Sequence, residues 1–559
     1  MAVSSSTEPL RARYAHPCPW DQAFPPLTMP AMFAQSVAAH PAAPLVEFIG
    51  RTYSYAALAE QAGRFAAWLQ AQGLAKGDRV GLFLPNVPAY VAAYYGAMIA
   101  GATVVNFSPL YTVPELEAQV ADSGTRLLVT LDVPALLPTA LAVLDGSALE
   151  RLVVIRLAGQ LPPLKGLALR LLRGKSLTAI PKRPDVARWA DTQRPAAPTP
   201  MALEPERDVA LIQYTGGTTG TPKGAMLSHQ NLTANARQVN AIDPRAGSRD
   251  VIMGVLPLFH VFANTCVLNR TVANGGCIAM LPRFDAGQAL AALQRVKATA
   301  MPGVPTMYQA LLDHPALAKT DFSSLRVCIS GGAPLPAPVK AKFEAASSSR
   351  VVEGYGLTES AGVVSTNPYE GENRAGTIGQ PLPGTRVRLL DKEDPARDAP
   401  PDAPGELAVQ GPQVMLGYWN RPEADAEAFA LREGGRWLRT GDVAVLDAEG
   451  YIRIVDRTKD MIAVGGFKVF PSQVEAVLVT HPAVREALVI GVPDAYRGEA
   501  PRAFVTLIEG AEDSAEGLRD WLNERLGKHE RVDAVVVRAG LPKTMIGKLD
   551  RKALRAEVL

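Results

Sequence analysis

The feature that most constrains the fold is a regular alternation of short apolar runs with helical segments. Between residues 79 and 130, the strand-like runs RVGLFLP, ATVVNF and TRLLVT are separated by AYVAAYYGAMIAG and ELEAQVADSG, which have helical patterns. A second series between residues 251 and 356 holds VIMGVLP, GCIAML, ATAMPGVP, LRVCISGG and VVEGYG, each followed by a turn or a helix-like stretch. Parallel strands are joined through such helical crossovers, so the alternation predicts two α/β subdomains.

The pattern of apolar runs and turn residues changes towards the C-terminus. Residues 371–455 hold short strand-like runs between Gly and Pro turns, which predicts a small β-rich unit. Mixed patterns follow, with PSQVEAVLVTH and AEGLRDWLNERLG helical and EALVIGV and AFVTLI strand-like. We therefore expect an α/β multidomain protein with a large N-terminal body over residues 1–456, a hinge at 457–460 and a small α+β C-terminal domain over 461–559.

Composition and charge exclude several classes of function. The 559 residues include 57 Lys and Arg against 55 Asp and Glu, so no overall positive field favours nucleic acid. The four cysteines are scattered and form no C-x-x-C pair, as in a protein of a reducing compartment. The N-terminus lacks the apolar run of a secretory signal, and no uninterrupted apolar run is long enough to span a membrane. We expect a cytoplasmic protein that binds no nucleic acid.

The segment 161–183, LPPLKGLALRLLRGKSLTAIPKR, stands apart from the rest of the chain. It interleaves leucines with six Lys and Arg residues and contains no acidic residue. One interpretation is a patch that contacts the inner face of a membrane peripherally. The other, which we favour, is a surface connection whose leucines pack on the parent domain.

A short segment crowded with Gly and Thr, YTGGTTGTPKGAM (214–226), is a candidate phosphate loop. Gly lets backbone N–H groups approach an anion, Thr hydroxyls add donors, and Lys223 adds a positive charge. It is not a Walker A loop, because Pro222 precedes Lys223 and Gly224 occupies the place of the magnesium-binding hydroxyl. Taken alone, the segment is equally compatible with an ordinary Gly-rich turn.

Five further motifs follow in order: SGGAPL (330–335), EGYGLTES (353–360), RTGDVAVLDAEGYIRIVDRTKD (439–460), GGFKVFPSQVE (465–475) and LPKTMIGKLDRKAL (541–554). The first two lie where an apolar strand ends, which is where α/β sheets place ligands. In this order the set resembles the acyl-adenylate-forming superfamily of acyl-CoA synthetases, firefly-type luciferases and peptide-synthetase adenylation domains. The sequences of these motifs, together with PWDQAFPP near the N-terminus, look most like those of bacterial long-chain fatty acid–CoA ligases. The resemblance runs from residue 19 to the end.

The resemblance implies an ATP site with Mg²⁺. The residues that would grip the triphosphate are Thr215, Gly216, Gly217, Thr218, Thr219, Gly220 and Lys223. The residues that would surround the adenine and the α-phosphate are Gly332, Ala333, Pro334, Glu353, Gly354, Tyr355, Gly356 and Thr358. Glu359 and Thr218 would hold Mg²⁺, a cation that prefers oxygen ligands. Asp442 would accept hydrogen bonds from the ribose hydroxyls, and Arg457 would support the same contact.

Lys548 is the residue that we expect to catalyse the first step. Activation of an acid brings its carboxylate against the α-phosphate of ATP, and a lysine that touches both offsets their repulsion. No general base is needed, because the carboxylate is already ionised at neutral pH. The alternative is an exposed lysine in a mobile basic tail, and we expect Lys543, Arg551 and Lys552 to be of that kind.

For the second step, the resemblance implies that a mobile C-terminal domain swings about Lys459 to present coenzyme A to the same pocket. Gly465, Gly466 and Phe467 would line the channel for the pantetheine arm, and His260 would gate it. A lone histidine is more often packed or capping a helix. The acyl pocket would involve residues 303–308, Gly331 and 354–357, none of which determines chain length. Lys468 also departs from the neutral residue that long-chain relatives often carry.

The expected activity is an ATP- and Mg²⁺-dependent ligation of a medium- or long-chain fatty acid to coenzyme A. The alternatives are an aryl-acid or dicarboxylate CoA ligase, an acyl-AMP ligase that loads a separate carrier protein, a luciferase-like oxidation, and a nucleotide-binding regulator. The motifs leave the oligomeric state open, a homodimer included.

Overall fold

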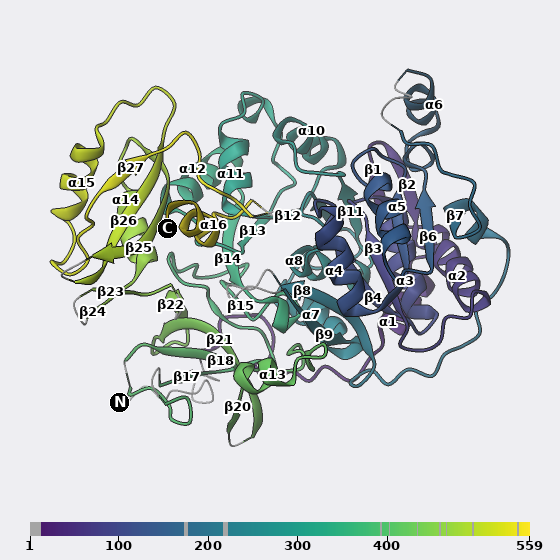
Figure 1. Cartoon of the computed structure of the whole chain (residues 1–559), viewed down its shortest axis with the longest axis horizontal. Helices are drawn as coiled ribbons and strands as arrows, with labels where there is room; N and C mark the ends of the chain where they lie inside the picture. The colour runs from purple at the N-terminus through teal and green to yellow at the C-terminus, as the bar shows by residue number, and fades with distance from the viewer. Residues whose placement is uncertain are drawn as a thin grey trace.

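The computed structural model describes residues 13–172, 177–215, 222–391, 394–401, 403–432, 434–457, 460–464, 467–494, 497–544 and 547–559. It has the predicted fold class, with a large N-terminal body of two α/β subdomains, a small β-rich unit and a small α+β C-terminal domain (Figure 1). Several predicted site residues lie outside the described ones: Gly216, Gly217, Thr218, Thr219, Gly220, Lys459, Gly465 and Gly466. For Phe467 only the backbone is described.

The first α/β subdomain contains an eight-stranded sheet in the order β19-β9-β8-β4-β3-β5-β6-β7. Its strands are β3 (Arg79–Phe83), β4 (Thr103–Phe107), β5 (Thr125–Leu131), β6 (Arg151–Ile155), β7 (Val186–Arg188), β8 (Val209–Thr215), β9 (Lys223–Ser228) and β19 (Gly417–Tyr418). Its helices are α2 (Tyr55–Ala71), α3 (Pro88–Ile99), α4 (Val113–Ser123), α5 (Leu137–Gly146) and α6 (Pro163–Leu172), with the short turns η2 (Leu157–Gly159) and η4 (Trp189–Gln193). Strands β3 to β8 pair in parallel through helical crossovers, as the alternating pattern predicts.

The second subdomain contains a nine-stranded sheet in the order β16-β15-β14-β13-β12-β10-β11-β1-β2. Its strands are β1 (Pro44–Phe48), β2 (Arg51–Ser54), β10 (Val251–Gly254), β11 (Cys277–Met280), β12 (Ala300–Gly303), β13 (Val327–Gly331), β14 (Arg350–Tyr355), β15 (Ser365–Thr366) and β16 (Gln380–Pro381). Its helices are α1 (Met29–Ala39), α7 (His229–Ala241), α8 (Val261–Ala263), the π-helix η5 (Asn264–Asn269), α9 (Arg270–Asn274), α10 (Ala286–Val296), α11 (Pro305–Leu312), η6 (Leu317–Lys319), α12 (Ala337–Ser347) and the 3-10 turn η7 (Thr358–Ser360).

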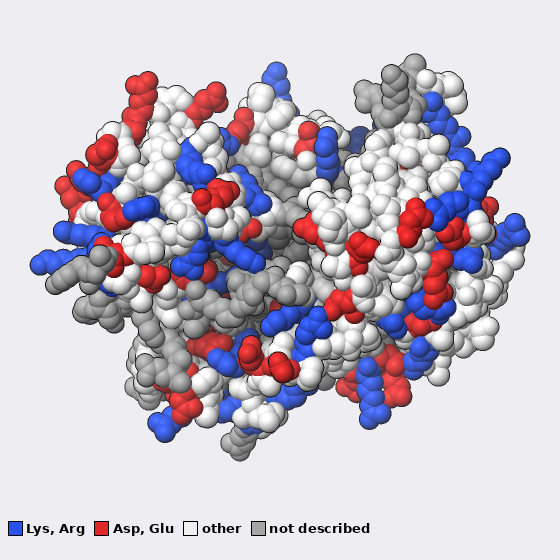
Figure 2. All heavy atoms as spheres, viewed as in Figure 1, with Lys and Arg blue, Asp and Glu red and all other residues white. Residues whose placement is uncertain are grey.

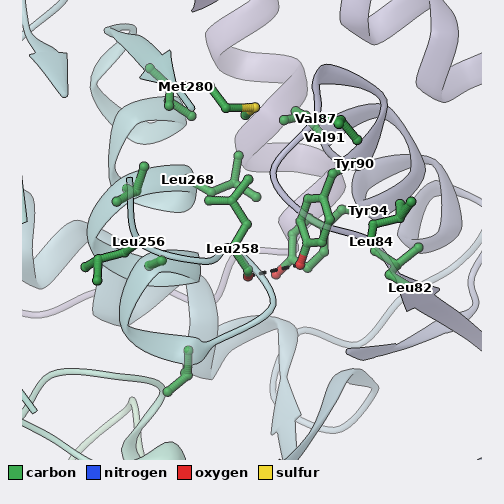
Figure 3. Close-up of a cluster of buried hydrophobic side chains, with 14 of the residues drawn as sticks. Leu82, Leu84, Val87, Tyr90, Val91, Tyr94, Leu256, Leu258, Leu268 and Met280 are labelled. Carbon is green, nitrogen blue, oxygen red and sulfur yellow. Dashed lines mark hydrogen bonds between the residues drawn. The ribbon is translucent and has the colours of Figure 1, made fainter. Parts of the chain in front are cut away.

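The two subdomains share one hydrophobic core, in which α3 is buried on nearly every side. A helix that is apolar all round must be enclosed by other elements. In Figure 3, Tyr90 and Tyr94 of α3 face Leu258 and Leu268 of the second subdomain, and Leu82 of β3 lies on the other side of the tyrosines. The Tyr90 hydroxyl donates to the backbone oxygen of Leu258 at 3.0 Å, so the buried polar atom is satisfied across the junction.

The β-rich unit and the C-terminal domain complete the chain. The five-stranded sheet of the unit contains β17 (Arg386–Leu390), β18 (Gly405–Gln410), β20 (Phe429–Arg432), β21 (Gly435–Leu446) and β22 (Ile452–Arg457), with α13 (Pro422–Ala428) beside it. The C-terminal domain has its own core and contains β23 (Ile462–Val464), β24 (Phe467–Val469), α14 (Pro471–Leu478), β25 (Val484–Asp494), β26 (Gly498–Leu507), α15 (Ala515–Asn523), β27 (Val535–Val537) and α16 (Arg551–Val558). β15, β16 and β19 belong to the sheets of the body. The local sequence pattern did not predict which sheets these strands join.

Helix α6 corrects one expectation about the segment 161–183. We favoured leucines packed on the parent domain, but Leu164 and Leu171 of α6 are exposed. Within the described parts of the chain, no helix combines the length and apolarity that a membrane span requires.

Candidate functional site

A cleft of about 2130 Å³ lies where the body, the β-rich unit and the C-terminal domain meet. Residues of all three parts line it, among them Lys223 of the body, Asp442 of the β-rich unit and Lys548 of the C-terminal domain. All six motifs, which are far apart in the sequence, therefore contribute residues to one cavity.

The base of the candidate phosphate loop is a β-hairpin. β8 and β9 pair in antiparallel register, and Thr215 lies opposite Lys223 where the two strands leave the sheet. The Lys223 ammonium lies 5.2 Å from the centre of the Tyr418 ring, a cation–π distance. Lys223 and Thr215 both line the cleft, so a cation and a hydroxyl stand at the point where the loop begins and ends.

Glu359 is a carboxylate that lines the cleft and is connected to the base of the hairpin through Tyr418. It lies in η7, and its Oε1 accepts a hydrogen bond from the Tyr418 hydroxyl at 2.7 Å. Tyr418 thus contacts both the predicted metal ligand and Lys223, a role that no signal in the sequence indicated. In the described part of the chain no three His, Cys, Asp or Glu side chains gather as a metal cage. One carboxylate beside a phosphate site nevertheless suits Mg²⁺, which takes most of its ligands from water and substrate phosphates.

Asp442 stands at the centre of the predicted ribose contact. It is buried in β21 directly opposite Arg457 of β22, and Arg457 Nε donates to its Oδ1 at 3.1 Å. The Tyr355 hydroxyl at the end of β14 donates to Oδ2 of the same carboxylate. The Asp442 side chain therefore connects Tyr355, which we predict to lie beside the adenine, with Arg457, the last residue of β22.

The predicted adenine walls follow the ends of β13 and β14. The residues of these walls that line the cleft are Gly332, Ala333, Pro334, Glu353, Gly354, Gly356 and Thr358. Burial raises the pKa of Glu353, whose Oε2 accepts from the backbone N–H of Leu335 at 3.3 Å and so connects the two segments. Gly356 has no room for a side chain, because a Cβ there would overlap the backbone oxygen of Gly362.

Lys548 enters the cleft from the C-terminal domain. Its side chain runs across Gly332, where φ is +83° and a Cβ would overlap the lysine. The adjacent backbone is held to the body because Thr306 Oγ1 of α11 donates to the Gly547 oxygen at 3.0 Å. The pKa of Lys548 is lowered to about 8, mainly by burial and secondly by the positive charge of Arg457, while the negative charge of Asp442 partly opposes both. The Lys548 side chain is therefore partly desolvated, and it lies where the residues that we predict to bind the nucleotide come together.

Two of the three residues that we assigned to a mobile basic tail have fixed partners. Arg551 donates to Asp460 Oδ2 and to Glu475 Oε1, both at 2.7 Å, and it is largely buried. Lys543 forms an ion pair with Glu486 at 2.6 Å. The expectation was wrong for both, because the acidic partners lie about 60 to 90 residues away in the sequence and carry no local signal.

His260 lines the cleft beside Lys548 and also caps a helix. Its Nδ1 accepts from the backbone N–H of Phe262 at 3.3 Å at the start of α8. Burial, and secondly the positive charge of Lys548, lower the pKa of His260 to about 3. The imidazole is therefore neutral near pH 7, and with Nδ1 accepting, its proton is on Nε2.

Apolar side chains from α7, η5, β13 and α12 form part of the lining of the cleft, and we call this part of the lining the apolar arm. The side chains that line it are those of Val239, Ile242, Phe262, Cys266, Ile329, Val339, Val363 and Tyr369. Of the residues predicted for the acyl pocket, Gly331 and residues 354–357 line the cleft, whereas within 303–308 only Pro305 and Thr306 reach it. The fully buried Tyr308 instead donates to backbone oxygens of Met301 and Ile329.

Tyr369 lines two cavities. A separate surface depression of about 340 Å³, lined by Arg245, Arg326 and Arg350, shares Tyr369 with the apolar arm. The buried Arg270 guanidinium lies 5.9 Å from the centre of the Tyr369 ring. Tyr369 therefore separates an apolar interior from a basic surface, a position that only the fold reveals.

Comparison with known proteins agrees with this arrangement. Residues 33–419 match the AMP-binding enzyme family, and residues 473–548 match the AMP-binding enzyme C-terminal domain. The chain is 39% identical to a long-chain-fatty-acid–CoA ligase of Bacillus subtilis, over 99% of this chain and 98% of the relative. It is 37% identical to a feruloyl-CoA synthase of Amycolatopsis, over 92% of this chain and 96% of the relative.

Among solved structures, ATP-bound MatB from Rhodopseudomonas palustris superimposes with a TM-score of 0.83 at 30% identity, covering 95% of this chain and 99% of MatB. Both domains of the family are thus present in order, and their junction is the cleft described above. The chain belongs to the AMP-binding enzyme family and, with it, to the acyl-adenylate-forming superfamily whose motifs its sequence resembles.

Proposed function

We propose that the protein activates a medium- or long-chain fatty acid with ATP, forming acyl-AMP and pyrophosphate, and then transfers the acyl group to coenzyme A with release of AMP. The observation that carries this proposal is the apolar arm, which is part of the same cleft that Lys548 and His260 line. An extended alkyl chain is the ligand that such a wall suits, because its burial needs no polar partner.

In the first step, the carboxylate oxygen of the acid attacks the α-phosphorus of ATP, and the bond to the β-phosphate oxygen breaks. Lys548 would contact both reacting groups and offset the repulsion between them. Asp442 and Arg457 would fix the ribose, and Lys223 would hold the pyrophosphate as it leaves. Glu359, with Thr218 as the second ligand predicted from the sequence, would hold Mg²⁺, which reduces the charge of the triphosphate when it is bound.

In the second step, the sulfur of coenzyme A attacks the acyl carbon, and the carbon–oxygen bond to AMP breaks. We propose that the C-terminal domain swings about 457–460 before this step, removing Lys548 and bringing in the loop with Gly465 and Gly466. The contacts with the body that would have to break include the hydrogen bond from Thr306 to Gly547 and the half-exposed ion pair between Arg485 and Asp313.

A second candidate substrate class is aromatic acids, because a feruloyl-CoA synthase is among the similar proteins. A dicarboxylic acid is a third candidate class, which the experiment below distinguishes from the first two because dicarboxylic acids are included among the substrates. A carrier protein as acceptor, in place of coenzyme A, is the remaining alternative.

The experiment is to measure AMP and pyrophosphate release by the purified protein with ATP and Mg²⁺. It uses a series of straight-chain, aromatic and dicarboxylic acids, with and without coenzyme A. We expect AMP and a thioester to appear together, with the highest kcat/KM among straight-chain acids. Highest turnover of aromatic or dicarboxylic acids would refute the fatty-acid assignment, and acyl-AMP without thioester would instead indicate a carrier protein as the acceptor.

A further inference from the structure

Helix α6 presents its apolar side to solvent. Leu164, Leu167 and Leu171 are 82%, 53% and 73% exposed. The opposite side of the helix carries Gly166, which is buried so closely against the backbone oxygen of Ala158 in η2 that a Cβ would collide with it. Gly166 thus fixes the orientation in which the leucines face outward.

Two cations flank this leucine stripe. At about 100° per residue, Leu164, Leu167 and Leu171 share one face, with Lys165 on one side of them and Arg170 on the other. Both basic residues are exposed, and the Lys165 ammonium donates to the backbone oxygen of Ile49 at 2.8 Å. The whole segment 161–183 contains no Asp or Glu. The face therefore combines an apolar stripe with a positive border.

The stripe also lies at an accessible place. α6 projects from one end of the molecule, beyond the first α/β subdomain and far from the C-terminal domain (Figure 1). In Figure 2 the described atoms at this tip are white and blue. Among the described residues nine large apolar side chains are exposed, and three of the nine belong to this single helix. Such a concentration marks an interaction surface rather than scattered surface leucines.

We propose that α6 docks the protein on a membrane surface that contains anionic lipids. Leu164, Leu167 and Leu171 enter the boundary between headgroups and acyl chains, while Lys165 and Arg170 meet the lipid phosphates. A second copy of this chain is a poorer occupant, because a symmetric contact would bring two identical basic faces together. The inference stands on the helix alone and does not depend on which acid the enzyme activates.

The test is co-flotation of the full-length protein with vesicles of phosphatidylcholine alone and of phosphatidylcholine with phosphatidylglycerol. We expect binding to the anionic vesicles that weakens as salt is raised. Leu164→Ser should reduce the partition coefficient about tenfold, and Leu164→Ser with Leu171→Ser about a hundredfold. Lys165→Gln with Arg170→Gln should reduce binding to anionic vesicles while leaving binding to neutral vesicles unchanged.

The matched control is Leu431→Ser, because Leu431 of β20 is 81% exposed yet lies outside the leucine stripe. It should bind vesicles like the wild type, and all variants should keep the wild-type melting temperature. The proposal is overturned if the wild type fails to float with anionic vesicles, or if Leu164→Ser and Leu431→Ser bind equally. It is also overturned if sedimentation shows a dimer that Leu164→Ser dissociates while vesicles have no effect.

Discussion

We expect the empty enzyme to resist closure of its C-terminal domain at neutral pH, because closure buries a charged lysine. In the closed arrangement the pKa of Lys548 falls from its usual 10.5 to about 8, mainly through burial and secondly through Arg457. When the domain swings away, Lys548 returns to water and its pKa returns to the usual value. At 1.36 kcal/mol for each pH unit between the two values, closure over the protonated lysine costs about 3 kcal/mol.

The sign of the pH dependence follows from proton release. Lys548 loses its proton on closure between pH 8 and 10.5, so the closed form gains as the pH rises through this window. The penalty is fully present below pH 8, where it reduces the closure equilibrium about 300-fold relative to a neutral side chain. Bound ATP and carboxylate place negative charge beside Lys548, which raises its pKa and removes the penalty.

The assay is fluorescence energy transfer between dyes on Lys319→Cys of the body and Asp520→Cys of the C-terminal domain, both exposed positions. Burial raises the pKa of Cys266, Cys277 and Cys328 to about 12, so these thiols resist labelling at pH 7. Without ligands, the closed fraction should rise between pH 8 and 10 in the wild type, whereas Lys548→Met should close more at pH 7 and show no such rise. The same pH dependence in both proteins would refute the reasoning.

Three further outcomes test the site. Lys548→Ala should slow acyl-AMP formation roughly 10³-fold while leaving thioester formation from supplied acyl-AMP largely intact; equal loss in both half-reactions would contradict its assigned role. Asp442→Asn removes the charge that Arg457 and the ribose share, so the KM for ATP should rise about tenfold to a hundredfold with less effect on the KM for the acid. Tyr369→Ala removes the large side chain that the apolar arm shares with the basic depression, so it should raise kcat/KM for longer acids over the preferred acid about tenfold, whereas Val339→Ala, which leaves Tyr369 in place, should leave the preferred length unchanged.

The sequence alone predicted the parts of the site that lie in continuous motifs. SGGAPL and EGYGLTES follow β13 and β14 because an apolar run followed by Gly marks the end of a strand, and parallel strands bring their carboxyl ends to one edge. The hairpin that begins at Thr215 and ends at Lys223 was likewise expected as a loop. These predictions depend only on residues that are close in the sequence, because secondary-structure propensity and turn-forming residues can be recognised locally.

The residues that the sequence did not reveal are those whose partners are distant. Tyr418 reaches Glu359 only because β19, taken from the β-rich segment, pairs with β9 of the first sheet. Tyr369 acquires its position from the packing of η5 and α9 against the second sheet. In α6 the helical period predicted which leucines share a face, but the fit of Gly166 against Ala158 decides which face turns outward.

Arg551 shows how one such residue gives Lys548 its function. Its guanidinium joins Asp460, at the end of the predicted hinge, to Glu475 of α14, and its Nε donates to the backbone oxygen of Val489 at 3.0 Å. These contacts are largely buried, so they are stronger than the half-exposed pair between Arg485 and Asp313 that connects the domain to the body. A swing would therefore break the contacts with the body first and keep the C-terminal domain whole. Lys548, three residues before Arg551, would then move together with the rest of the C-terminal domain. Two half-reactions in one cleft require such a movement, because Lys548 must leave the cleft between the first step and the second.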